Sequence, residues 1–267
     1  MNADDYHKYL EYIESGQLLE AVKLKIRKIP TVLYKYFSLS NDCVLNAAKI
    51  QYISESKMYL STLSSFNDPF EGKFLIFNQD NLAQKGWDID LIHEYYDNLR
   101  NFWRATCLSD TNEQNMPMWA YYANNHQGFC VEYILSDMQK KYIFPVSYES
   151  DRQCADSIVT RVINAFGKYK YEGIEPDGED SALLQCLLLS FAAKHKSWSH
   201  ENEYRIIHPD SDFPLIASKI YIGLNCKPEY AQDLLKIGEA SKGLCHIYQM
   251  TLERDNPNFE LQKVKLI

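Results

Sequence analysis

The chain of 267 residues is long enough for one large domain, and its 46% of hydrophobic residues can fill a sizeable core. A net charge of −8 argues against a broad electrostatic grip on nucleic acid, which needs clustered Lys and Arg. No apolar run reaches the roughly 18 residues of a membrane span, and the acidic, polar N-terminus is unlike a signal peptide. The 7 Cys include no C-x-x-C pair, so we expect reduced thiols in a cytoplasmic protein without membrane contact.

Hydrophobic periodicity predicts alternating helices and strands along the chain. Helices are expected over residues 4–28, 41–48, 80–102, 116–124, 151–168, 180–196 and 228–241. Strands are expected over residues 32–37, 57–62, 105–108, 128–133, 142–148, 204–208, 219–222, 245–251 and 259–266. This content predicts an α+β fold.

The domain organisation follows from the lack of a Pro-, Gly- or Ser-rich linker. We expect an N-terminal helical segment at residues 1–29 and a single α+β domain at residues 30–267. Helical insertions are expected at about residues 80–102 and 151–196. The acidic loop at residues 172–180 contains Gly and Pro and is the best candidate for a flexible insertion.

The most informative segment is residues 59–72, where a strand that ends in hydroxyl residues runs into an Asn-Asp-Pro turn. Asx side chains bond their own backbone and Pro fixes φ, so the turn is rigid. A rigid polar turn that carries two carboxylates is a candidate site, and the alternative is a tight connection that Asp68 stabilises. The candidate residues are Tyr59, Ser61, Thr62, Asn67, Asp68 and Glu71.

Three further side chains suit a ligand-binding cleft. Lys35 lies between two Tyr on a strand and either holds an anionic group or faces water by alternation. Trp119 and Tyr122 lie on an aromatic helix and either form a stacking wall for a planar ligand or fill the core. His126 follows that helix and either acts as an acid or base or complements the helix dipole.

A late strand carries a pair of carboxylates. Glu201 and Glu203 are two residues apart, so within a strand their side chains face the same side. Such a pair is costly unless it is solvated, paired with a cation or used in catalysis. Arg205 continues the same face and can neutralise one of them, so a structural Glu–Arg network is the alternative.

These segments together resemble a bacterial family, the domain of unknown function 2971. The resemblance spans about residues 31–225, and its most specific parts are the FNDPFEG and W-x-x-E-x-E-Y-R runs. Relatives of this kind occur among bacterial phage-defence genes, so the resemblance implies a defence effector or toxin with a protein partner. The residues that carry it are 33–36, 66–72, 118–128 and 198–205.

A second resemblance is to the ADP-ribosyltransferase superfamily. One branch has a basic residue on the first strand, then Ser-Thr-Ser, then Glu-x-Glu. Lys35, residues 61–63 and residues 201–203 follow this order, although Lys replaces Arg or His and Leu63 replaces the third hydroxyl. The resemblance implies mixed, largely antiparallel sheets that form a cleft with flanking helices, and NAD as the substrate.

The same resemblance implies a role for each residue. Glu203 would stabilise the positive charge that builds on the ribose, and Glu201 would orient or deprotonate the acceptor. Lys35 would meet the pyrophosphate. The other implied NAD-binding residues are Ser61 and Thr62 beside the ribose, and Tyr59, Trp119 or Tyr122 against nicotinamide.

The leading hypothesis is therefore an ADP-ribosyltransferase-like enzyme or toxin that acts on NAD, with an unknown acceptor and no metal. One alternative is a metal-dependent hydrolase or nuclease, because carboxylate and imidazole groups suit Mg²⁺ or Mn²⁺. Another is a non-catalytic protein-interaction module that uses the 20 Tyr and the acidic loop. The metal ligands would be Asp68, Glu71, Glu132 and His126.

Overall fold

The computed structural model describes residues 1–267 except 1–4, 6, 7, 10, 13, 14, 67, 155, 176, 177, 256 and 259. The predicted candidate Asn67 and parts of the acidic loop therefore lie outside the described residues. Helices make up 42% and strands 25% of the chain, in sheets that do not close into a barrel. The predicted α+β class is confirmed.

The helices and strands have the following bounds. The α-helices are α2 (Leu18–Lys28), α3 (Cys43–Ser54), α4 (Gln79–Gln84), α5 (Ile89–Phe102), α6 (Met116–Tyr122), α7 (Asp137–Lys140), α8 (Asp156–Glu172), α9 (Gly178–Ser190) and α10 (Pro228–Ala240), and the 3₁₀ helices are η1 (Leu63–Ser65) and η2 (Lys196–Glu201). The strands are β1 (Val32–Phe37), β2 (Lys57–Tyr59), β3 (Ser61–Thr62), β4 (Leu75–Ile76), β5 (Arg104–Ser109), β6 (Phe129–Ile134), β7 (Ile143–Pro145), β8 (Ser147–Glu149), β9 (Gln153–Cys154), β10 (Ala193–His195), β11 (Glu203–His208), β12 (Asp212–Pro214), β13 (Ala217–Ile222), β14 (His246–Thr251) and β15 (Gln262–Lys265).

The main sheet has nine strands in the order β15-β14-β13-β6-β1-β5-β11-β7, with β3 beside β5. Its pairs are antiparallel except β13 with β14, as the sequence predicts for a largely antiparallel sheet. The pairing of β1 with β5 is limited to one residue pair, Tyr34 opposite Ser109, whereas β1 with β6 and β5 with β11 each share six pairs. The sheet is thus two half-sheets that diverge between β1 and β5.

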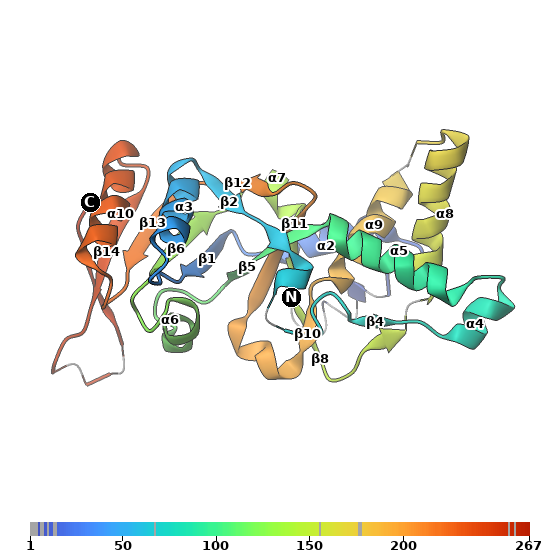
Figure 1. The fold of residues 1–267 in the computed structure, drawn as a ribbon, viewed down its shortest axis with the longest axis horizontal. Helices are drawn as coiled ribbons and strands as arrows, with labels where there is room; N and C mark the ends of the chain where they lie inside the picture. Colours follow the sequence, from blue (N-terminus) through green and yellow to red (C-terminus); the bar gives the residue numbers. More distant parts are fainter. Residues whose placement is uncertain are drawn as a thin grey trace.

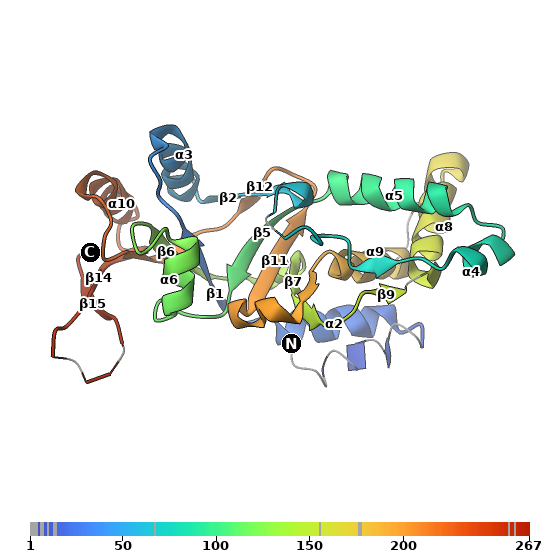
Figure 2. The same ribbon diagram turned by 60° about the horizontal axis from the view of Figure 1, so that its bottom comes forward.

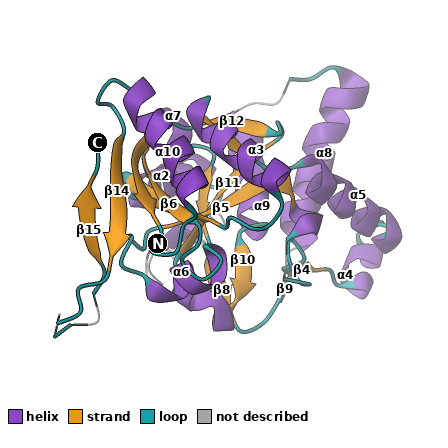
Figure 3. Cartoon of the chain, turned by 60° about the vertical axis from the view of Figure 1, so that its left-hand side comes forward, coloured by secondary structure: helices purple, strands orange, loops and turns teal. Residues whose placement is uncertain are grey.

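Each half-sheet has its own helices (Figure 1). On the half with β1, β6 and β13, helices α3 and α10 cover one face, and α6 lies on the other (Figures 1 and 2). On the half with β5, β11 and β7, a second core gathers side chains of α2, α5, α8 and α9. Strands β14 and β15 form the free edge of the sheet (Figure 3). None of the described helices has the length and apolar character that crossing a membrane requires.

Local sequence signals explain where several elements differ from prediction. The helix predicted over residues 80–102 is divided into α4 and α5, because Gly86 adopts a left-handed conformation with φ of 78°. Helix α3 begins after Asp42, whose carboxylate accepts the amide N–H of Leu45 at 3.0 Å, and extends to Ser54, whereas we expected a helix over residues 41–48. A turn at residues 15–16 interrupts the long N-terminal helix that we expected over residues 4–28.

The junction between α6 and β6 depends on a close backbone approach. A Cβ at Gly128 would overlap the carbonyl oxygen of Phe37. We predict that Gly128→Ala lowers the free energy of unfolding by about 3 kcal/mol, because the backbone of β1 must shift. Gly167→Ala in α8 is the matched control, since no atom lies within 4 Å, and it should stabilise by about 0.5–1 kcal/mol. Urea denaturation measures both, and equal effects of the two variants would contradict the prediction.

Candidate functional site

A cluster of buried charges lies beside the split in the sheet. Its centre is Arg205 on β11, which is 0% exposed. The Arg205 guanidinium donates to both carboxylate oxygens of Glu71, to the Glu203 carboxylate at 2.7 Å and to the carbonyl of Phe191 at 2.6 Å. A buried guanidinium is stable only when its donors are paired in this way. Arg205 therefore fixes the FNDPFEG turn and the Glu203 carboxylate relative to each other.

A second cation links the two acids. The ammonium of Lys194 on β10 donates to Glu201 at 2.6 Å and to Glu203 at 2.9 Å. Glu201 also accepts a short hydrogen bond from the hydroxyl of Tyr122, at the end of α6. The amide N–H of Glu203 donates to the hydroxyl of Tyr148 at 2.8 Å. The two carboxylates are thus held by side chains from three separate segments of the chain.

The cluster gives its two neighbouring carboxyls opposite pKa shifts. Burial alone would raise the pKa of Glu203, but the charges of Arg205 and Lys194 outweigh burial and hold that pKa well below its usual range. For Glu201, burial outweighs the hydrogen bonds from Lys194 and Tyr122, so its pKa is raised. Glu203 is accordingly ionised at neutral pH, while Glu201 takes up a proton more readily than an ordinary carboxyl.

Both carboxylates face a cavity of about 80 Å³ at the divergence of β1 and β5. Lys35 on β1 also lines it, and its ammonium donates to the carbonyl of Cys107 at 2.9 Å. Burial lowers the pKa of Lys35. The lining residues are Tyr34, Lys35, Tyr36, Phe66, Cys107, Leu108, Ser109, Met118, Tyr122, Lys194, Glu201 and Glu203. The structure therefore brings together four of the predicted site residues, which are Lys35, Tyr122, Glu201 and Glu203.

Trp119 does not form the predicted stacking wall. It is 0% exposed, and its indole N–H donates to the carbonyl of Glu113 at 2.8 Å. Its ring packs against Tyr36 and stacks on His126, with ring centroids 5.3 and 5.6 Å apart. Trp119 therefore lies in the core, which was the alternative for this residue. Helix α6 turns its side chain toward the sheet and leaves Tyr122 at the cavity.

The predicted hydroxyl pair and Tyr59 lie away from the cavity. Tyr59 is half exposed on β2 and its ring lies 5.7 Å from that of Tyr52. Ser61 and Thr62 form β3, which pairs with the start of β5 opposite Ala105 and Arg104. The cavity is at the other end of β5, so these three residues do not line it. The hydroxyl that does line it belongs to Ser109.

The two acids do not share a strand face as expected. Glu201 ends the 3₁₀ helix η2, and Asn202 adopts a left-handed conformation with φ of 44° before β11 begins at Glu203. This reversal of the backbone, and not strand alternation, directs both carboxylates to Lys194. Arg205 does share the face of Glu203, as predicted, because both lie on β11 two residues apart.

The remaining candidates have other partners. Asp68 accepts the amide N–H of Phe70 at 2.9 Å, as an Asx turn requires. His126 stacks on Trp119, and its Nδ1 is buried without a hydrogen bond among the described residues. Glu132 on β6 accepts hydrogen bonds from Lys219 and Ser218. Glu71, Glu132 and His126, proposed as metal ligands, therefore belong to three different networks.

Sequence reasoning missed Lys194 and Ser109. Lys194 was placed within a predicted helix over residues 180–196, whereas α9 ends at Ser190 and residues 193–195 form β10 beside β8. Lys194 could have been found by a charge argument. Two buried carboxylates need a second cation besides Arg205, and Lys194 is a nearby lysine in the sequence. Ser109 directly follows the strand predicted over residues 105–108, whereas β5 extends to Ser109 and its hydroxyl donates to the carbonyl of Glu201 at 2.6 Å.

Comparison with known proteins adds one finding. Residues 118–206 match the model of DUF2971, a family of proteins of unknown function. The matched stretch contains α6 from Met118 onward and the segments that carry Lys194, Glu201, Glu203 and Arg205, so the predicted resemblance is confirmed there. It is shorter than the 31–225 that we expected. No curated protein and no solved structure matches the chain.

The opposite shifts of the two carboxyls predict opposite pH dependences. Because the folded-state pKa of Glu203 is lowered, its contribution to stability is present above the unfolded pKa and is lost as the pH falls. The folded-state pKa of Glu201 is raised, so its contribution is lost as the pH rises through that value. The free energy of unfolding of wild type minus that of Glu203→Gln should therefore fall as the pH is lowered. The free energy of unfolding of wild type minus that of Glu201→Gln should rise as the pH is lowered. Denaturant titrations between about pH 3 and 8 test this, and parallel curves would contradict it.

Removal of the central cation should be far more costly than removal of an exposed one. We predict that Arg205→Met lowers the free energy of unfolding by about 3–5 kcal/mol, because Glu71 and Glu203 are left buried without their partner. Arg254→Met is the control, because Arg254 is exposed, and its effect should lie within about 0.5 kcal/mol. Chemical denaturation measures both, and a neutral Arg205→Met would refute the central position of this residue.

Proposed function

We propose that the protein cleaves the bond between nicotinamide and ribose in NAD and transfers the ADP-ribosyl group to an acceptor. The observation that carries the proposal is the order of neighbouring strands β1, β5 and β11. They carry Lys35, Ser109 and Glu203 to one cavity. This is the chain order of basic residue, hydroxyl residue and Glu-x-Glu that the ADP-ribosyltransferase resemblance implies, with Ser109 in place of Ser61 and Thr62.

The strand register supports the proposal. Ser109 lies opposite Glu203 on β11 and opposite Tyr34 on β1, so Ser109 and Glu203 share a row across the sheet, and Lys35 is the residue after Tyr34 on β1. The Ser109 hydroxyl donates to the main-chain carbonyl of Glu201 and so braces the segment that carries both acids. A row of residues on rigid strands holds reacting groups more accurately than a loop does.

The unequal protonation of the two acids also supports it, since paired carboxyls with separated pKa values typically divide acid–base roles. As the C–N bond breaks, nicotinamide leaves with the bonding electron pair and positive charge builds on the ribose. The ionised Glu203 is suited to stabilise that charge. An acceptor atom then bonds to the ribose carbon, and its proton passes to Glu201, which has the higher affinity for protons.

The size of the cavity sets a condition on binding. About 80 Å³ is well below the roughly 300–1,000 Å³ of small-molecule pockets, so side chains of the lining must move before a nucleotide enters. Tyr34, Lys35, Phe66 and Tyr122 are partly exposed at this cavity, so they are the side chains that must change rotamer, and three of them then leave their packing against a core. Lys35 then meets the phosphates as a point charge.

Loss of one charge at the proposed reaction centre gives a direct test. We predict that Glu203→Gln lowers NAD cleavage or ADP-ribosyl transfer by about 10²–10⁴-fold, because the charge that stabilises the ribose is lost. The measurement is the release of nicotinamide from NAD by the purified protein, with cell lysate as the source of acceptor. If the activity is toxic, expression of wild type slows bacterial growth and expression of Glu203→Gln does not.

The matched control is Glu113→Gln. Glu113 is also a buried carboxylate paired with a lysine, Lys263 at 2.5 Å, but it does not line the cavity. This variant should retain activity. Wild-type protein that neither binds nor consumes NAD, or a Glu203→Gln variant as active as Glu113→Gln, would refute the proposed function.

A further inference from the structure

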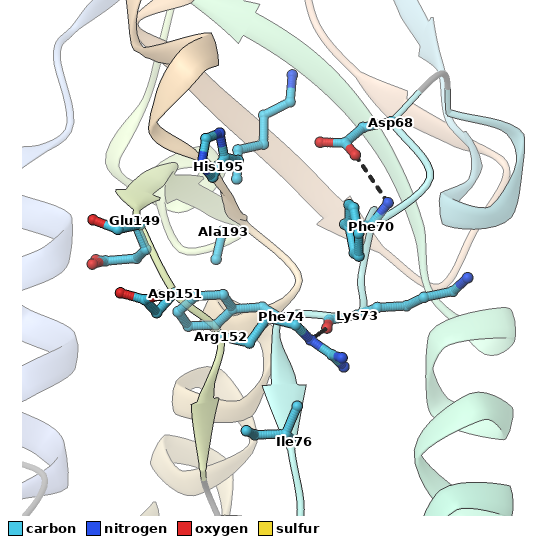
Figure 4. A pocket seen from close by; sticks show the side chains of 12 residues that line it. Asp68, Phe70, Lys73, Phe74, Ile76, Glu149, Asp151, Arg152, Ala193 and His195 are labelled. Atoms are coloured by element: carbon cyan, nitrogen blue, oxygen red, sulfur yellow. Dashed lines mark hydrogen bonds between the residues drawn. The ribbon is translucent and has the colours of Figure 1, made fainter.

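A second, larger hollow lies on the other side of Lys194. Its volume of about 530 Å³ falls within the range of small-molecule sites. Lys194 lines both this hollow and the cavity at the split, so one side chain separates the two. Figure 4 shows the residues around it, which are Asp68, Phe70, Lys73, Phe74, Ile76, Glu149, Ser150, Asp151, Arg152, Ala193, Lys194 and His195.

The buried polar group of this hollow is the carboxylate of Asp68. Asp68 is only 7% exposed, and its side chain points into the hollow (Figure 4). One oxygen accepts the amide N–H of Phe70 at 2.9 Å. Among the described residues, the Asp68 carboxylate has this one hydrogen bond. Its second oxygen can therefore accept a hydrogen bond from a ligand. A carboxylate oxygen that has no protein donor can accept a charge-assisted hydrogen bond from a cation.

The cations around the hollow are already engaged or directed away. Lys194 is neutralised by Glu201 and Glu203. The Arg152 guanidinium donates to the carbonyls of residues 73 and 75, at 2.7 and 3.0 Å. The Lys73 ammonium is exposed and points away from the other lining residues (Figure 4). The carbonyls leave the charge of Arg152 in place, but the lining has three carboxylates, Asp68, Glu149 and Asp151, against Arg152 and Lys73, the two cations without an ion pair among the described residues. The net charge that the lining presents to a ligand is therefore negative.

Aromatic rings complete the walls. Phe70 is 60% exposed although it lies in a rigid turn, and Phe74 is nearly buried beside it. Exposed aromatic faces attract cations and pack against alkyl chains. A carboxylate within an aromatic-walled hollow therefore selects a guanidinium or ammonium group on a slender apolar stem.

We propose that this hollow is a binding site for an alkyl guanidinium or alkyl ammonium group, with Asp68 as its counter-ion and Phe70 as its aromatic wall. The site stands on the geometry of the hollow and does not depend on the reaction proposed above. Its ligand is either a free organic cation or a basic side chain of a peptide.

Calorimetric titration of the full chain tests the site with three probes: agmatine, an end-blocked Gly-Gly-Arg-Gly-Gly peptide and the same peptide with neutral citrulline. We expect one site per chain for the cations and at least about tenfold weaker binding of the citrulline peptide, because a charge-assisted hydrogen bond is lost. Tighter binding of agmatine identifies a free cation as the ligand, and tighter binding of the peptide identifies a side chain.

Two variants, Asp68→Asn and Phe70→Ala, test the charge and the aromatic wall of the site separately. Asp68→Asn keeps an oxygen that accepts the N–H of Phe70, so the turn is preserved while the charge is removed. It should weaken cation binding by at least about tenfold, and Phe70→Ala should weaken it while charge is unchanged. Asp90→Asn on the exposed start of α5 is the control and should bind as wild type does. Absence of cation binding, equal binding of the citrulline peptide, or full affinity in Asp68→Asn would overturn the proposal.

Discussion

The buried guanidinium of Arg205 is the interaction on which the candidate site depends. It joins Glu71 of the FNDPFEG turn to Glu203 of β11, and Lys194 extends the chain of charges to Glu201. Three carboxylates thus share two cations in a region that water barely reaches. Such a network contributes less to stability than an apolar core of the same size, and its distinct effect is on the protonation of its members.

The second constraint is the split in the sheet. A continuous sheet would bury the strand faces under helices, but β1 and β5 meet at one residue pair and then diverge. This leaves room for a cavity between strands that are otherwise well paired, at the point where the charge network reaches it. One hydrophobic core runs under both halves, from Leu33 and Val131 to Leu108 and Ile206, so the strands on either side of the cavity are held by common packing. Rigid elements therefore surround a hollow lined with polar groups, which is the arrangement that binding and catalysis require.

The sequence predicted the elements better than it predicted the site. Strands β1 and β11 are rich in β-branched and aromatic side chains, and that composition identified both strands, with Glu203 next to the predicted start of β11. Trp119 could not be assigned, because an aromatic residue on a short helix suits a core as well as a cleft. Lys194 was missed because an apolar helix precedes it and β10 has only three residues. Ser61 and Thr62 fitted the motif order, but strand pairing, which the sequence does not specify, placed Ser109 at the cavity instead.

The central claim is that Arg205 and Lys194 hold Glu203 ionised, while burial raises the proton affinity of Glu201 against the hydrogen bonds from Lys194 and Tyr122. Carbon-13 NMR of glutamate side chains over a pH titration measures this directly, with the two signals assigned by Glu201→Gln and Glu203→Gln. The account predicts that Glu203 stays ionised to a pH well below the range of ordinary glutamates and that Glu201 titrates above that range. Two signals that titrate together near the ordinary value would contradict it.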